Sequence, residues 1–192
     1  QFASTTNGAT GDNSTAMGIR TEASGNNSTA MGRNTEAFGP YSTAMGDFTE
    51  ASGYSSTAMG GSTEAFGDYS TAMGYDTDAS GDFSTAMGRN TDAIGNYSTA
   101  MGNNTDASGN YSTAMGYDTE AIGDFSTAMG TFTEAPSYTE TAIGSHNTPY
   151  TPAGVTFWNS GDRLFVIGNG SSSSSKSDAM IVYKDGSTII NG

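Results

Sequence analysis

The chain repeats itself every fourteen residues over most of its length. Residues 11–24 read GDNSTAMGIRTEAS, and the same frame continues without an insertion to give nine copies. A tenth copy over residues 137–147 is degraded, because Ile143 stands in the Met position and Glu140 in the Ser position. Self-similarity at a fixed period indicates an architecture in which each unit stacks on its neighbours.

Each copy consists of two similar halves of seven residues. The first half reads Gly-x-x-Ser-Thr-Ala-Met, and the second reads Gly-x-x-Thr-Glu/Asp-Ala-x. Glycine followed by two polar residues predicts a tight turn, and the residues after it predict a short strand. A glycine at every seventh position argues against a helix. One copy therefore predicts one flattened coil of a parallel β-solenoid, with two strands and two turns, stacked about 4.8 Å from the next coil.

The carboxylates decide which side chains point into the coil. An ionised Glu22 cannot line a narrow lumen unpaired, so it faces outward and its neighbours Thr21 and Ala23 face inward. By equivalence of the two halves, Ser14 and Ala16 point inward, whereas Thr15 and Met17 point outward. The sequence thus predicts a lumen filled by Ala, Ser and Thr.

Two chemically different outer faces follow from this alternation. One face carries a threonine column beside a methionine column, which we predict to be the subunit interface: Met17, Met31, Met45, Met59, Met73, Met87, Met101, Met115 and Met129. The other carries a column of carboxylates: Glu22, Glu36, Glu50, Glu64, Asp78, Asp92, Asp106, Glu120 and Glu134. A continuous apolar column exceeds what soluble monomers usually expose, so it is expected to meet copies of the same chain in a closed symmetric assembly. The number of copies does not follow from these residues.

Composition and charge exclude several kinds of partner. The net charge is −14, with six Lys and Arg against twenty Asp and Glu, so no basic stripe for nucleic acid exists. No apolar run is long enough to insert this segment into a membrane. The chain has no cysteine, which excludes disulfides and thiolate metal sites. It begins at Gln1 without a signal-peptide pattern, as expected of a fragment or a mature chain.

The repeat resembles a known family. Segments such as STAMGIRTEASG and STAMGRNTEAFG, over roughly residues 9–147, are similar to the head repeats of YadA-like trimeric autotransporter adhesins. The resemblance implies an all-β fold, a left-handed parallel β-roll, and a homotrimer packed on its more apolar faces. We expect residues 1–147 to form this roll and residues 148–192 to form a small antiparallel β-module that caps it, joins it to another part or makes its tip.

The C-terminal residues resemble segments of bacterial surface fibres and of phage or injection-system tail fibres. From the residues themselves we predict four strands: Val155–Trp158, Leu164–Ile167, Ala179–Tyr183 and Thr188–Ile190. Asp185-Gly186 predicts a two-residue hairpin between the last two strands, and the Ser171–Ser175 run predicts a flexible loop. Tyr150, Phe157 and Trp158 are candidate contacts for a glycan, since aromatic rings can stack on sugars.

The sequence does not predict an enzyme. His146 is the only histidine, so neither a Ser-His-acid triad nor a pair of imidazole ligands can form. One acid per coil is a poor calcium site, and no cofactor is expected.

We therefore expect an extracellular segment, on a bacterial surface or in a phage or injection-system fibre, that binds a surface glycan or protein receptor or spaces a terminal module. The alternative is an ice-binding β-solenoid that uses its threonine ladders. The methionine column beside the threonines and the charged second face argue against that alternative.

Overall fold

A computed structural model of the chain describes residues 8–191 and contains β-strands but no helix within that range. The chain divides into two compact units, residues 1–91 and 92–192. The first seven residues of the predicted roll lie outside the described range.

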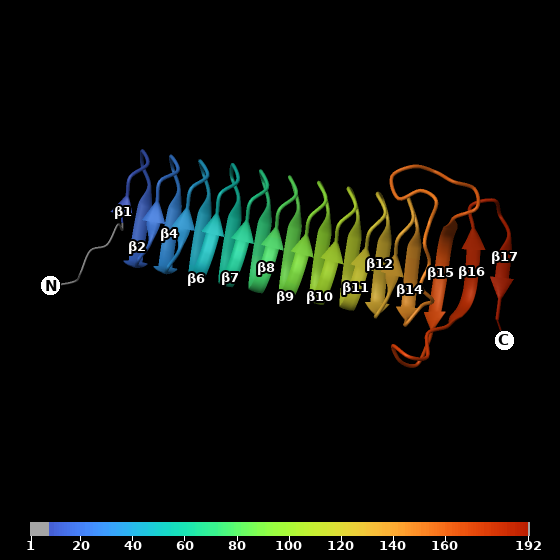
Figure 1. Cartoon of the computed structure of the whole chain (residues 1–192). Coiled ribbons are helices and arrows are strands. Elements are labelled where there is room, and N and C mark those ends of the chain that lie inside the picture. The colour runs from blue at the N-terminus through green and yellow to red at the C-terminus, as the bar shows by residue number, and fades with distance from the viewer. Residues whose placement is uncertain (1–7, 192) are drawn as a thin grey trace. The chain divides into compact units, whose positions relative to one another are not determined.

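The first unit is a stack of parallel strands in which partners are fourteen residues apart (Figure 1). Met45 pairs with Met59, and Met59 pairs with Met73, so equivalent residues of successive coils form columns. The predicted solenoid and its period are confirmed. Its strands are β1 (Gly8–Ala9), β2 (Thr15–Ile19), β3 (Glu22–Ala23), β4 (Thr29–Arg33), β5 (Glu36–Ala37), β6 (Thr43–Ala51), β7 (Thr57–Ala65), β8 (Thr71–Ala79) and the first part of β9 (Thr85–Ala93).

Several coils carry their strand through a corner. β6, β7 and β8 each run for nine residues, where the sequence predicted two short strands separated by a turn. The corner begins at a glycine such as Gly46, whose φ of 133° is open to glycine and strained for other residues. In these coils the ladder continues through the corner, since Gly46 pairs with Gly60 and Thr49 pairs with Thr63.

The lumen is filled as predicted. Alanines such as Ala44 and Ala51 have no exposed surface, and the inward Ser and Thr side chains, such as Ser42 and Thr49, are buried. Small side chains let the two walls of each coil approach closely. The hydroxyl oxygens of many of these residues, Thr63 among them, have no hydrogen-bond partner among the described residues.

Replacing one lumen threonine should therefore stabilise the roll. Thr63→Val keeps the shape of the side chain and removes a buried hydroxyl without a partner, so we expect the free energy of unfolding to rise by about 1 kcal/mol. Thr57→Val on the outward column is the matched control and should give no gain, because that hydroxyl reaches water. Denaturant titration measures both variants, and a destabilised Thr63→Val variant would contradict this account of the lumen.

The second unit begins as the same kind of stack and ends as an antiparallel sheet (Figure 1). β15 still pairs in parallel with β14, although the partner residues Ile143 and Ile167 are separated by an insertion. β16 and β17 then add to β15 in alternating directions. Its strands are the last part of β9, β10 (Thr99–Ala107), β11 (Thr113–Ala121), β12 (Thr127–Thr131), β13 (Glu134–Ala135), β14 (Thr141–Ser145), β15 (Arg163–Asn169), β16 (Asp178–Tyr183) and β17 (Thr188–Ile190).

Three of the four strands predicted for the C-terminal residues are present, and one is wrong. Residues 155–158 form no strand, although they are apolar. They belong to a loop that lies on the turns of the last coils, where the Gly154 and Val155 carbonyls accept hydrogen bonds from the amides of Tyr138 and Asp124. The backbone of this segment is therefore committed to turns and not to a ladder.

The hairpin between β16 and β17 also differs from the prediction. The Tyr183 N–H donates a hydrogen bond to the Ser187 carbonyl. This bond leaves residues 184–186 as a three-residue loop, where the sequence predicted a two-residue turn. Gly186 has a φ of 90°, the left-handed conformation that the last position of such a loop requires. The serine run, predicted to be a flexible loop, closes on itself through an isolated bridge between Ser172 and Ser175.

Candidate functional site

The methionine column lies on the outer surface of each unit. In the first unit it contains Met17, Met31, Met45, Met59, Met73 and Met87, and in the second Met101, Met115 and Met129. Met17 is 60% exposed, and the other eight are partly exposed. None of these side chains points into the lumen, because the alanine before each of them does so.

The carboxylate column lies on the other outer face of the coil, past the corner. Burial raises the pKa of Glu36 and Glu64, and the carboxylates one coil above and below raise it further. The pKa of Glu120 is raised in the same way, by burial and by the neighbouring carboxylates of Glu134 and Asp106. The two columns thus differ in charge as well as in position: the methionine column is neutral, and the carboxylate column is anionic.

Aromatic side chains in the turns stack on one another. In the second unit the rings of Tyr97 and Tyr111 lie 4.8 Å apart at 1°, and Tyr111 and Phe125 lie 4.8 Å apart at 2°. In the first unit Tyr69 stacks on Phe83 at 4.9 Å. Stacking on a sugar needs an open ring face, and these faces cover each other. These stacked pairs therefore hold adjacent coils together.

The three candidate glycan contacts differ in their surroundings. The Tyr150 hydroxyl donates a hydrogen bond to Asp162 Oδ1 at 2.5 Å, and the Arg163 guanidinium lies 4.6 Å from its ring centroid. Phe157 and Trp158 are 56% and 52% exposed. These two side chains are available to a ligand, and Tyr150 is held in a cluster of polar groups.

That cluster was not foreseen from the sequence. It contains the buried charged residues Glu140, Asp162, Arg163, Asp178 and Lys184. Glu140 occupies the lumen position of the degraded repeat, where other coils have Ser, and this substitution is the one signal that could have revealed it.

Glu140 is held at the base of the cluster. Its Oε2 accepts a hydrogen bond from the Ser137 amide at 2.9 Å, and Lys184 Nζ donates to Ser137 Oγ at 3.1 Å. Burial raises the pKa of Glu140 to about 7, although the hydrogen bonds from Ser137 oppose the rise. Burial also lowers the pKa of Lys184. At neutral pH this lumen position is therefore shared between a carboxylic acid and a carboxylate.

Asp162 anchors the inserted loop. Burial alone would raise the pKa of Asp162, but hydrogen bonds from the Tyr150 hydroxyl and from the amides of Ala153 and Gly154 hold it below its ordinary value. Burial and the bond to Asp162 raise the pKa of Tyr150. A charged Asp162 thus fixes the loop that presents Phe157 and Trp158.

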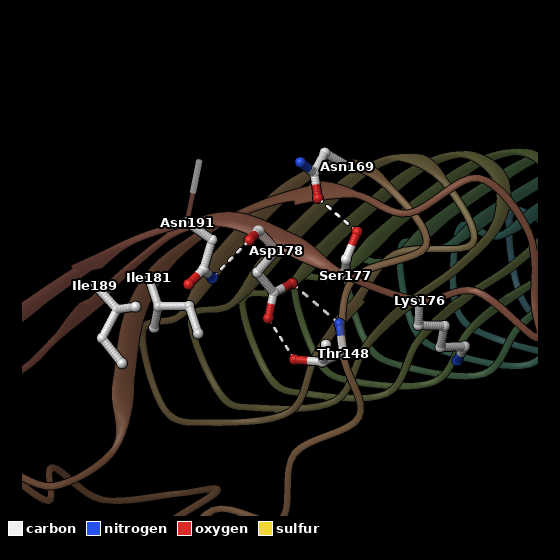
Figure 2. Close-up of a pocket in the computed structure, with 8 residues that line it drawn as sticks. All are labelled: Thr148, Asn169, Lys176, Ser177, Asp178, Ile181, Ile189 and Asn191. Carbon is white, nitrogen blue, oxygen red and sulfur yellow. Dashed lines mark hydrogen bonds between the residues drawn. The ribbon is translucent and has the colours of Figure 1, made fainter.

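An open pocket of about 530 Å³ lies beside β16 and β17, and Figure 2 shows the residues that line it. Ile181 and Ile189 form an apolar part of its wall. The Asp178 carboxylate also lines the pocket and accepts hydrogen bonds from the Thr148 amide and hydroxyl. Arg163 lies 3.5 Å from the same carboxylate. The lining residues are Thr148, Asn169, Lys176, Ser177, Asp178, Ile181, Ile189 and Asn191. The carboxylate is therefore a structural tie between the inserted loop and β16.

Neither a metal site nor a membrane span is found among residues 8–191. No group of three or more His, Cys, Asp or Glu side chains there could hold a metal ion. No helix in the described part of the chain is long and apolar enough to cross a bilayer.

The repeat geometry agrees with a comparison against protein families. The model of the YadA head domain repeat, which spans two copies, matches residues 9–35, 23–49, 51–77, 79–105 and 107–133. The chain belongs to the YadA head repeat family. This membership indicates a segment of an adhesin of the trimeric autotransporter type. No curated protein matches the sequence.

Proposed function

We propose that this YadA head segment is a structural and adhesive part of a trimeric surface fibre. Three copies pack on the faces that carry the methionine column and leave their carboxylate columns in water. The fibre is extracellular, on a bacterial surface or in a phage or injection-system tail fibre, and displays or spaces its C-terminal residues for attachment.

The separation of the two outer columns carries this proposal. Each copy has a net charge of −14, so copies can approach closely only through a surface without carboxylates. The threonine and methionine columns supply such a surface, and their regular spacing lets equivalent columns of different copies match along the stack. A threefold arrangement closes the assembly and prevents open filaments.

Molar mass in solution tests the assembly. Light scattering at micromolar concentration should give three times the chain mass of 19.6 kDa. A clean monomer would refute the proposal.

The exposed loop is the proposed contact with a cell-surface glycan or protein receptor. Phe157 and Trp158 project from a loop that Asp162 holds in place, so they need little ordering on binding. Replacing both by alanine should lower binding to a glycan array or to receptor-bearing cells at least about tenfold. Phe48→Ala is the matched control, because Phe48 is an equally exposed aromatic residue of the first unit. Equal binding by the loop variant and the control would show that attachment lies elsewhere or that the segment is only a spacer.

The ice-binding alternative remains a separate hypothesis. Its support is the outward threonine columns, which pair in register in both units. A methionine column stands two residues away on the same strands, so the face is not a plane of threonine alone. Thermal hysteresis in the wild-type protein would favour this alternative, and we expect none.

A further inference from the structure

The methionine column of the second unit does not end with the repeats. β12 pairs Met129 with Ile143 of β14, and Ile143 pairs with Ile167 of β15. Across the antiparallel pairs, Ile167 lies opposite Met180, and Met180 lies opposite Ile190. One apolar column therefore runs in register from the coils onto the C-terminal sheet.

The threonine column changes its character at the same place. Thr127 pairs with Thr141, but Thr141 pairs with Phe165, and Phe165 pairs with Val182. The coils carry one apolar and one threonine column, whereas the C-terminal sheet carries two columns that are almost wholly apolar. Phe165 and Val182 thus continue the threonine column as large apolar side chains.

These side chains are not needed for the core of the chain itself. Val166 and Ile181, on the inner face of the sheet, are buried. Phe165, Ile167, Met180 and Val182 alternate with them and are partly exposed, and Ile190 is 76% exposed. A contiguous apolar face of this kind marks an interaction surface.

We propose that the C-terminal sheet binds the same sheet of other copies through this face and holds the assembly together more strongly than the methionine column does. The C-terminal face is defined by Phe165, Ile167, Met180, Val182 and Ile190. This inference rests on the proposed function, since the face continues the column that is proposed to meet other copies.

Charge and register identify the occupant as a second copy. The C-terminal face has no charged side chain. Chains that each carry a net charge of −14 repel one another, so an uncharged surface favours contact between them. It is aligned with the methionine column, so an assembly that buries one brings the other into contact along the same side of the second unit. Phe165 and Val182 stand where the coils carry Thr, so each strand of the sheet offers more apolar surface than a strand of the roll, and the sheet should bind more strongly for its length.

Two double variants test the proposal in the full chain. Ile167→Thr with Met180→Thr removes a cross-strand pair from the C-terminal face, and Met115→Thr with Met129→Thr removes a neighbouring pair from the roll. Sedimentation velocity over a dilution series should show the first variant dissociating at a concentration at least about tenfold higher than the second. Equal dissociation of the two variants, or weaker assembly of the Met115 and Met129 variant, would overturn the inference.

Two controls separate the ways in which the test could fail. Ile190→Lys lies at the exposed end of β17 and should also dissociate the assembly without affecting the fold, which circular dichroism checks. If Ile190→Lys is folded and assembles like the wild type, the inference is wrong. A monomeric wild type would refute the proposed function itself, whereas an assembled wild type with an equally assembled Ile167 and Met180 variant would refute only this inference.

Discussion

Gly74→Ala should unfold or severely destabilise the first unit. A Cβ at Gly74 would lie 1.9 Å from the carbonyl oxygen of Gly88 in the next coil. The φ of Gly74 is 136°, which is strained for any residue with a side chain. The atom it meets belongs to the backbone and cannot rotate away. We expect the free energy of unfolding to fall by at least about 3 kcal/mol, since backbone strain and overpacking act together.

Gly61→Ala is the matched control for this prediction. Its Cβ would lie 3.2 Å from Tyr75 Cδ2, which belongs to an exposed side chain that can move. The effect should stay within about 0.5 kcal/mol, as for ordinary surface substitutions. Thermal and denaturant unfolding measure both variants. Similar stabilities for Gly74→Ala and Gly61→Ala would show that the coils are not held at this close approach.

Lowering the pH from 8 to 5 should stabilise the second unit. The pKa of Glu140 is about 7 in the folded chain against an ordinary 4.5, so the folded state holds its proton more tightly than the unfolded state. The stabilisation is complete below pH 4.5 and is lost as the pH rises through 7. It amounts to on the order of 3 kcal/mol for a shift of this size. Glu120 of the same unit, whose pKa is also raised, acts with the same sign.

Glu140→Gln isolates the contribution of this residue. The amide oxygen can still accept the hydrogen bond from Ser137, and no charge remains to be buried beside Lys184 and Arg163. We expect most of the dependence of stability on pH between 5 and 8 to disappear, and the variant to be more stable than the wild type at pH 8. The measurement is denaturant unfolding at a fixed protein concentration. An unchanged pH dependence would contradict the assignment.

The repeat could be predicted because it is local and periodic. Glu22 alone settled the alternation, and the buried Thr21 and Ala23 then followed from the geometry of a strand. The ladders of methionine and of carboxylate need only that alternation and the period of fourteen. The continuous nine-residue strands were missed because the glycine of each coil was interpreted as the end of a strand, whereas Gly46 pairs with Gly60 within the ladder.

The C-terminal residues could be predicted only in part because their structure depends on distant contacts. Residues 155–158 look like a strand, yet Asp162 and the turn amides of Asp124 and Tyr138 hold them and the residues before them in a loop. In the sequence, Arg163 and Asp178 are polar residues that directly precede two predicted strands. Only the fold brings them together with Thr148.

A cysteine placed in either outer column tests the central claim most directly, because the chain has no cysteine of its own. Met73→Cys and Asp78→Cys both lie in β8, on the methionine and carboxylate columns respectively. Under mild oxidation at micromolar concentration, Met73→Cys should form disulfide-linked dimers on a denaturing gel, and Asp78→Cys should stay monomeric. Crosslinking through Asp78→Cys with none through Met73→Cys would contradict the claim that the methionine column is the face on which copies meet.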